Sequence, residues 1–363
     1  MLELLSEAGK KINVITLRHL VAALSLALLT PTVSNAFCFQ PLANSRLQVF
    51  CIANVLISRA TNLGSVELLD YRLKQEGYSR GLGLPGMVKQ VTFSPYAWPV
   101  LDYSSDINGG NPDKPLKLGS LTFYGDEEYI RKKGVLIGVG FGGTGRAIYG
   151  QGKYLDYSIG GTYTYSPKHK ISVTGGFANV CSKNDVGKDF FLDGCVTTNR
   201  VKKDLTDQKA SSASLSIAKL FSEGQKRFHQ ASVGVQRYID DDYEQNQITM
   251  QLETVHRSDI FTSIDVSLGD KVKNTLTTRY SVTGTVGTNL FEKPISISFS
   301  YSSADGGKLL GLSREETTKL FGLKYAVHPR INLILGYRDT NSNIDYFDEN
   351  EAIVAVQFAP VQF

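Results

Sequence analysis

Long stretches in which apolar and polar residues alternate constrain the fold of this chain more than any other feature of its sequence. Residues 155–165 place their apolar side chains at every second position, at Leu155, Tyr157, Ile159, Tyr163 and Tyr165. The same pattern recurs in residues 295–301 and 331–337. A period of two residues is typical of β-strands with one apolar face and one polar face. An all-β fold is therefore predicted.

The length of these stretches separates two kinds of β protein. Strands of a soluble β-sandwich average five or six residues, with the apolar face turned inward. Strands that cross a membrane need about 9–11 residues, turn their apolar face to lipid and gather aromatic residues at both interfaces. Because many of the stretches exceed ten residues and end in aromatic residues, they favour an antiparallel transmembrane β-barrel of the bacterial outer membrane.

Counting such stretches predicts a barrel of about 14 strands over residues 95–363. The expected strands are 95–107, 135–149, 153–166, 170–182, 188–200, 210–222, 227–239, 244–257, 259–269, 274–288, 293–304, 316–327, 330–341 and 351–363. An even number is usual in bacterial single-chain barrels, and short turns are expected at one end with longer loops at the other. The connection 184–188 is expected to be longer than a tight turn. The final residue, Phe363, resembles the terminal aromatic signal that the bacterial barrel-insertion machinery recognises.

The first 36 residues have the features of an export signal. Lys10, Lys11 and Arg18 precede an apolar run over residues 20–29, and Ser34 and Ala36 supply the small residues of a signal-peptidase site. The run is about half the roughly 20 residues that a membrane-spanning helix requires. A short N-terminal anchor or a buried helix is the alternative. The bulky Phe37 before Cys38 argues against a lipoprotein cleavage site.

Residues 37–94 do not continue the strand pattern. Residues 46–60 are apolar enough for a helix, and residues 77–86 form a glycine-rich connection. The segment is too short for an independent domain with a strong core. Two arrangements remain open: packing in the periplasm, or filling of the barrel interior.

The sequence contains no recognisable catalytic constellation, so the chain is not expected to be an enzyme. The histidines are dispersed at positions 19, 169, 229, 256 and 328, away from any serine–acid arrangement of the hydrolase type. The glycine run at 138–145 is not followed by a helix that could form a phosphate site. No Cys/His cluster has metal-ligand spacing, and no cofactor is expected. A net charge of only +4 gives no case for nucleic-acid binding.

The predicted register turns charged residues of both signs toward the barrel interior. These lumen-facing residues are Arg146, Asp156, Glu253, Asp265, Arg279, Lys324 and Arg338. Such an interior suits a hydrated lumen, and a barrel of this size leaves more room than the filled eight-stranded kind. Whether the lumen is open or plugged is left undecided by the sequence.

Cys181 and Cys195 flank the connection between the fourth and fifth expected strands. Export places them in an oxidising compartment, and neighbouring antiparallel strands can bring two cysteines within bonding distance. A Cys181–Cys195 disulfide is therefore predicted if the register aligns them. Cys38 and Cys51 have similar spacing but no strand context, so they form the less favoured pair.

The barrel region resembles the C-terminal domain of the surface lipoprotein assembly modifiers (Slam), outer-membrane proteins that help deliver lipoproteins to the cell surface. The resemblance rests on the motif Asp106-Ile107-Asn108-Gly109-Gly110, on Tyr337-Arg338-Asp339 and on the strand count. Family members usually carry a periplasmic helical-repeat domain before the barrel, whereas this chain has only residues 37–94 there. The resemblance implies that substrate capture falls to this segment or to a separate partner.

Two functions are therefore expected. The first, implied by the resemblance, is delivery of a lipoprotein to the cell surface, with outer-membrane lipid, the barrel-insertion machinery and a surface lipoprotein as partners. The alternative is a porin-like channel for small solutes.

Overall fold

The computed structural model describes residues 38, 42–57, 63–78, 89–118, 120–359 and 361–362. The chain divides into two units, Met1–Ala36 and Phe37–Phe363, and every described residue belongs to the second. The predicted export signal of residues 1–36 and the terminal Phe363 lie outside the described residues.

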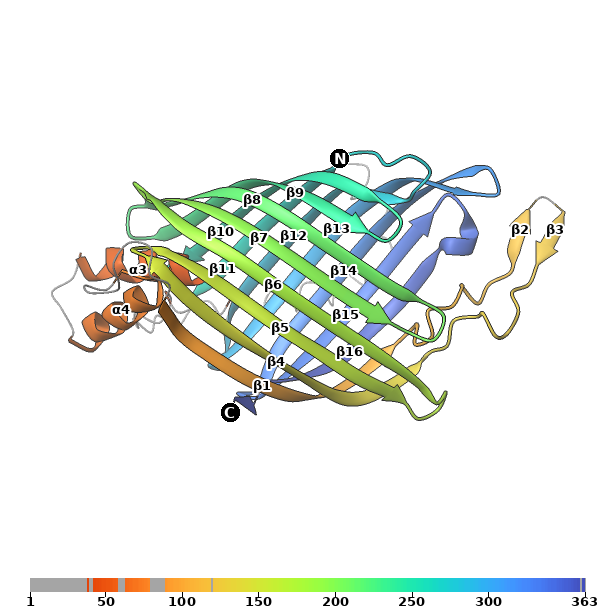
Figure 1. The fold of residues 1–363 in the computed structure, drawn as a ribbon, viewed down its shortest axis with the longest axis horizontal. Coiled ribbons are helices and arrows are strands. Elements are labelled where there is room, and N and C mark those ends of the chain that lie inside the picture. Colours follow the sequence, from red (N-terminus) through yellow and green to blue (C-terminus); the bar gives the residue numbers. More distant parts are fainter. Residues whose placement is uncertain are drawn as a thin grey trace, which may run out of the picture. The chain divides into compact units, whose positions relative to one another are not determined.

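The described part of the chain forms a closed antiparallel β-barrel of fourteen strands (Figure 1). The strands are β1 (Lys89–Ser104), β4 (Gly134–Gly150), β5 (Lys153–Ser166), β6 (Ile171–Gly187), β7 (Phe190–Lys202), β8 (Asp207–Glu223), β9 (Arg227–Asp240), β10 (Glu244–His256), β11 (Ile260–Gly269), β12 (Thr277–Leu290), β13 (Lys293–Leu309), β14 (Leu312–His328), β15 (Ile331–Ser342) and β16 (Glu349–Phe358). Each pairs with the next, and β1 closes the barrel by pairing with β16 and with the short β17 (Val361–Gln362). The prediction of an all-β, outer-membrane type barrel with about 14 strands is confirmed.

The alternating sequence explains the two faces of the wall. On β4, Val135, Ile137, Val139 and Phe141 are 45–60% exposed, and the residues between them include Leu136, which is 7% exposed. Residues directly opposite in an antiparallel ladder share a face. The exposed apolar positions therefore form the lipid-facing surface, and the alternate positions face the lumen.

Among the residues that the structure describes, no helix is long and apolar enough to span a bilayer.

Several strand boundaries differ from the prediction; for example, β13 and β14, expected to end at 304 and to begin at 316, run to Leu309 and from Leu312. β1 begins at Lys89, six residues before the expected domain boundary at 95, because its first residues pair with the end of β4 although they alternate poorly. The connection between β6 and β7, expected to be long, is the two-residue turn Lys188–Asp189. Both residues have positive φ, 55° and 63°, as in the tight hairpin turns that match the twist of paired strands.

The two ends of the barrel differ in their connections. Short turns such as 151–152, 257–259 and 329–330 lie at one end. Longer connections lie at the other: residues 105–133 carry the small hairpin of β2 (Leu116–Leu118) and β3 (Leu121–Phe123), and residues 343–348 carry the helical turn η2 (Asp345–Phe347). This asymmetry identifies the first end as periplasmic and the second as extracellular.

Helices α3 (Ser45–Ile57) and α4 (Leu63–Gln75) pack against the periplasmic end of the barrel (Figure 1). The α3 side chains Leu47, Cys51, Ile52 and Val55 are at most 6% exposed. They form one apolar cluster with strand residues near that end, namely Phe191, Ala218, Leu220, Phe228, Val255 and Phe261. This cluster holds α3 against the strand residues at that end of the barrel.

Candidate functional site in the barrel lumen

The helical segment is anchored to the barrel wall through Arg46. Its Nη1 and Nη2 donate to the two carboxylate oxygens of Asp193 on β7, at 2.9 and 2.6 Å. The guanidinium also lies 4.4 Å from the ring centre of Phe191. The Arg46 side chain is 6% exposed and that of Asp193 is 17% exposed. A bidentate pair in such a dry setting fixes the orientation of α3 as well as its position.

A second anchor joins the end of α4 to β4 and β5. Nη1 of Arg146 lies 3.0 Å from Oε1 of Glu76, and the Tyr154 hydroxyl donates to the other oxygen of the same carboxylate. Nη2 of Arg146 also donates to Asp156 at 2.9 Å. The Glu76 side chain is 4% exposed. Two of the predicted lumen-facing residues, Arg146 and Asp156, therefore belong to the contact that closes the periplasmic end.

This contact changes the pKa of the Glu76 carboxyl. Burial opposes its charged form, but Arg146 and hydrogen bonds from Ser45, Tyr154 and Arg146 outweigh burial and lower the pKa of the Glu76 carboxyl. For Arg46, burial is likewise overcome by Asp193 and Tyr154, which raise the pKa of the guanidinium. Both groups are therefore charged when the helices are docked.

Further polar contacts surround the two anchors. The Tyr78 hydroxyl donates to Asp185 in the β6–β7 hairpin, and burial followed by this carboxylate raises the pKa of Tyr78. The Asn44 side-chain amide donates to Glu253 on β10, another predicted lumen-facing residue, which is 8% exposed. The helical segment is thus held by strands on several sides of the barrel.

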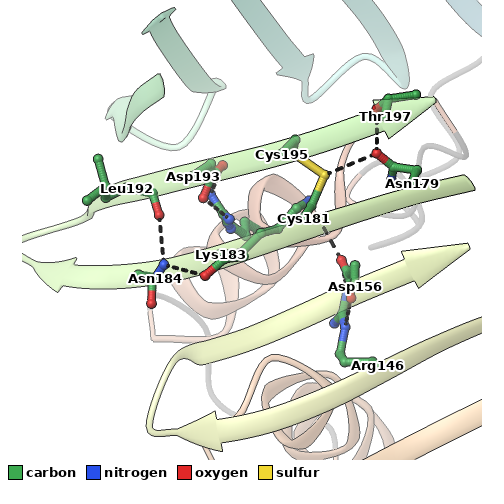
Figure 2. Close-up of a disulfide and its surroundings, with 12 residues drawn as sticks. Arg146, Asp156, Asn179, Cys181, Lys183, Asn184, Leu192, Asp193, Cys195 and Thr197 are labelled. Carbon is green, nitrogen blue, oxygen red and sulfur yellow. Dashed lines mark hydrogen bonds and ion pairs between the residues drawn. A yellow bond between two sulfur atoms is a disulfide. The ribbon is translucent and has the colours of Figure 1, made fainter. Parts of the chain in front are cut away.

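Cys181 and Cys195 are directly opposite each other on β6 and β7 and are joined by a disulfide (Figure 2). The ladder places Cys181 opposite Asp156 of β5, so the bridge lies on the lumen face. Asp193, two residues before Cys195, is the partner of Arg46. The bridge therefore ties β7, which carries Asp193, to its neighbour β6. Cys38 and Cys51, the less favoured pair, also form a disulfide, which joins the start of the helical segment to α3.

The extracellular half of the lumen contains a cavity lined by charged side chains. A cavity of about 660 Å³ lies there, lined by side chains from β14, β15, β16 and the loop 105–133. Arg338, a predicted lumen-facing residue, donates from Nη1 to Glu351 at 3.1 Å, and Arg314 pairs with Glu316 at 2.5 Å. The Arg338 side chain is 43% exposed. The Arg338 side chain is thus more exposed than Arg46 and Arg146, which are 6% and 18% exposed, although its partner Glu351 is 12% exposed.

The other predicted lumen-facing residues are not brought into one site. Asp265 accepts a hydrogen bond of 2.7 Å from Gln251. Arg279 lies 3.6 Å from Asp305, next to a register shift in the β12–β13 ladder. Lys324 is opposite Ser296 and Ile334 in the ladders of β14.

Hydrogen bonds and an ion pair of residues 106–110 hold the first extracellular loop in place. Asp106 Oδ1 accepts the backbone N–H groups of Gly109 and Gly110 at 2.8 and 3.2 Å, and its Oδ2 lies 2.8 Å from Lys203 Nζ in the β7–β8 connection. Gly109 has a φ of +76°, a conformation that glycine adopts without strain.

The next two residues of the motif are buried beneath this turn. Ile107 and Asn108 are both 0% exposed. The Asn108 amide bridges the backbone of Ile130 and Lys132, at 2.9 and 2.8 Å. In this structure the motif ties together two loops at the mouth of the barrel.

Sequence reasoning missed the residues that anchor the helices, above all Arg46, Glu76 and Asp193. One signal was available: Arg46 is the single charged residue at the start of an otherwise apolar segment. Its partner, however, lies 147 positions away along the chain, and no local pattern connects the two.

Nothing described here is arranged for metal binding or for hydrolase chemistry. Among the described residues, no group of three or more His, Cys, Asp and Glu side chains is placed to hold a metal ion. His229 and His256 each contact a threonine hydroxyl, at 2.8 and 3.1 Å.

No protein-family model matches the chain, and no curated protein sequence matches it. Several solved structures share its fold at low identity. OccK1 (OpdK) of Pseudomonas aeruginosa has a TM-score of 0.41 and 7% identity, covering 77% of this chain and 100% of its own. OccAB3 of Acinetobacter baumannii has 0.39 and 7%, covering 75% and 99%. A BenF-like porin from Pseudomonas fluorescens has 0.39 and 8%, covering 77% and 100%. These similarities concern the barrel fold.

Proposed function

We propose that this protein is a porin-like outer-membrane channel for small polar solutes, with a periplasmic mouth closed by its own helices α3 and α4. The observation that carries the proposal is the contrast within one lumen. Its extracellular half holds a cavity bordered by charges of both signs, whereas at its periplasmic end α3 packs on strand residues in an apolar cluster, beside a smaller cavity of about 420 Å³. A hydrated, charged interior suits the passage of polar solutes.

The contacts that hold α3 and α4 against the barrel suit a closure of the periplasmic mouth that can open. Besides the apolar cluster, the docked segment depends on the pairs Arg46–Asp193 and Glu76–Arg146. Such pairs are strong only while both partners stay together and dry, since separation exposes both charges to water again. In this proposal, outer-membrane lipid surrounds the barrel and the barrel-insertion machinery assembles it.

The proposal is tested by conductance in planar bilayers. The full chain should conduct weakly or in brief openings, and a variant lacking residues 38–78 should conduct steadily. The matched control replaces Lys74, whose pair with Asp70 is on the exposed face of α4, by Gln and should behave as the full chain does. Equal, negligible conductance of the full chain and the deletion variant would overturn the proposal.

Delivery of a surface lipoprotein, implied by the Slam resemblance, stays a prediction. It is separated from the channel by protease shaving of intact cells with and without the gene. Loss of a lipoprotein from the surface at constant total amount would favour delivery. Reduced uptake of small solutes with unchanged surface lipoproteins would favour the channel.

A further inference from the structure

Three aromatic side chains face the lumen near the middle of their strands: Tyr96 and Trp98 of β1, and Phe177 of β6. The ladders establish their direction. On β1, Tyr96 and Trp98 flank the position that is opposite Phe141, a lipid-facing residue of β4. On β6, Phe177 is on the same face as Cys181, which lies on the lumen face. We refer to these three side chains as the aromatic platform.

Glycines of the neighbouring strands lie beneath the platform. A Cβ atom at Gly140 would be only 2.1 Å from the Trp98 ring, and one at Gly160 would be 2.7 Å from the Phe177 ring. The rings therefore lie against the backbone of β4 and β5, in the space that side chains there would take. The ring of Tyr96 adjoins that of Trp98, with 5.5 Å between their centres. Because Phe177 faces the lumen, its exposed fraction of 37% is open to a solute and not to lipid.

The ladder row beside Tyr96 and Phe177, on the periplasmic side, is polar. It consists of one residue from each of β1, β4, β5 and β6, namely Ser94, Thr144, Ser158 and Asn179. Thr144, Ser158 and Asn179 also line the cavity of about 420 Å³. Within the described part of the chain, the hydroxyl groups of Thr144 and Ser158 form no hydrogen bond. They are therefore free to bind a solute.

The charged side chains of the same cavity are already engaged. Arg146 pairs with both Glu76 and Asp156. Nη1 of Arg72 donates to Gln75 at 3.4 Å, and its Nε is buried. The free polar groups that share the wall with the platform are thus uncharged.

Exposed aromatic rings beside free hydroxyl groups complement one class of small polar solute. A pyranose ring carries hydroxyl groups around its edge and, where these are equatorial, exposes C–H groups on its two faces. Such a face packs on an aromatic ring, while the hydroxyl groups exchange hydrogen bonds with Thr, Ser and Asn side chains. Solute sites commonly combine aromatic lining with a few placed polar groups in this way. A simple ion would use only the polar row.

We propose that the aromatic platform and the polar row beside it bind a neutral saccharide with equatorial hydroxyl groups. Its ring faces stack on Trp98 and Phe177, and its hydroxyl groups bind Thr144, Ser158 and Asn179. The route of the sugar to this site rests on the proposed channel function, whereas binding at the site is measured without transport.

The position of Trp98 provides a direct test, because it is the single tryptophan of the chain. Its fluorescence in the full chain in nanodiscs should change saturably on titration with cellobiose, whose glucose rings have equatorial hydroxyl groups. Sorbitol carries similar hydroxyl groups on an open chain without a ring face, so it should give no saturable change. Equal responses to both solutes, or no saturable response to cellobiose, would overturn the proposal. A tighter response to benzoate than to cellobiose would overturn it in favour of an aromatic acid.

Variants of Phe177 test the stacking surface. Phe177→Leu keeps an apolar side chain but removes the flat ring, and it should weaken cellobiose binding by about fivefold, within the contribution of one ring to an aromatic pair. Phe177→Tyr keeps the ring and should bind as the native chain does. The matched control is Phe141→Leu, which changes a 60% exposed phenylalanine on the lipid-facing side of β4. Heat-modifiable gel mobility verifies that each variant folds. Equal affinity in Phe177→Leu and Phe141→Leu would contradict the proposal.

Conductance of the same preparations separates this site from the channel. Steady conductance of the variant lacking residues 38–78, without a Trp98 response to cellobiose in the full chain, would overturn the saccharide site alone. A saturable response that Phe177→Leu weakens, with negligible conductance of both the full chain and the deletion variant, would overturn the channel and support the site.

Discussion

The two ends of the lumen use the same kind of ion pair in opposite surroundings. At the periplasmic end, the side chains of Arg46 and Glu76 are 6% and 4% exposed, and each meets its partner beside an apolar cluster. At the extracellular end, the Arg338 side chain is 43% exposed and borders a cavity, although its partner Glu351 is 12% exposed. Removing one partner of a buried pair leaves an uncompensated charge, whereas an exposed pair exchanges its partner for water at little cost. One set of pairs therefore fixes structure, and the other leaves room for a ligand.

The largest effect is expected from breaking the buried anchor. Arg46→Ala leaves Asp193 buried without its partner and should destabilise docking of the helices by about 3–5 kcal/mol. Hydrogen exchange of the α3 backbone amides should become faster, and bilayer conductance should rise. The matched variant Arg338→Ala removes an arginine from the exposed end and should change neither measurement. Unchanged exchange in Arg46→Ala would show that the apolar cluster alone holds the helices.

The disulfide between β6 and β7 supports the same end of the barrel. Replacing Cys181 and Cys195 together by Ser opens a closed loop of about 15 residues and should cost up to about 3 kcal/mol in the chain-entropy model. The temperature at which the folded barrel loses its heat-modifiable gel mobility should fall. Free-thiol labelling of both cysteines in the native, unreduced protein would contradict the bridge itself.

The second disulfide serves as the comparison. Cys38 and Cys51 are 13 positions apart, close to the 14 positions that separate Cys181 and Cys195. Replacing Cys38 and Cys51 by Ser should therefore loosen the helical segment and raise conductance, while the heat-modified mobility of the barrel stays the same. The two double variants thus distinguish the stability of the wall from that of the closure.

The sequence predicted the wall far better than what fills it. An alternation of apolar and polar residues is local, and a one-residue slip would turn a whole apolar face away from lipid, so both strand number and facing follow from it. The residues Arg146 and Asp156 could be assigned to the interior on this basis. Their partner Glu76 could not, because it lies 70 positions from Arg146 and in no periodic segment.

Acidification should release the closure without affecting the wall. The pKa of Glu76 is lowered in the folded protein, because Arg146 and its hydrogen bonds outweigh burial. Its contribution to docking is therefore complete above the ordinary value of 4.5 and is lost as the pH falls below that value toward the lowered pKa. Conductance should rise on acidification through this range. In the variant Glu76→Gln the rise should be much smaller, and a full rise in that variant would assign the pH effect to another group.

The smallest effect on stability is expected from breaking the Arg338–Glu351 pair at the extracellular end. Arg338→Gln removes the contact with Glu351, whose side chain is 12% exposed, but Arg338 is itself 43% exposed and the pair borders a cavity, so the loss of stability should be smaller than in Arg46→Ala. The same change alters the balance of charge in the lining by one unit, from five basic side chains to four. The net charge of the lining should therefore change while the thermal stability of the barrel changes little. Arg314→Gln provides the parallel case, because Arg314 pairs with Glu316 in the same lining and stacks on Phe347 at 3.4 Å. If Arg338→Gln destabilised the barrel as strongly as Arg46→Ala does, the two ends would not differ in kind.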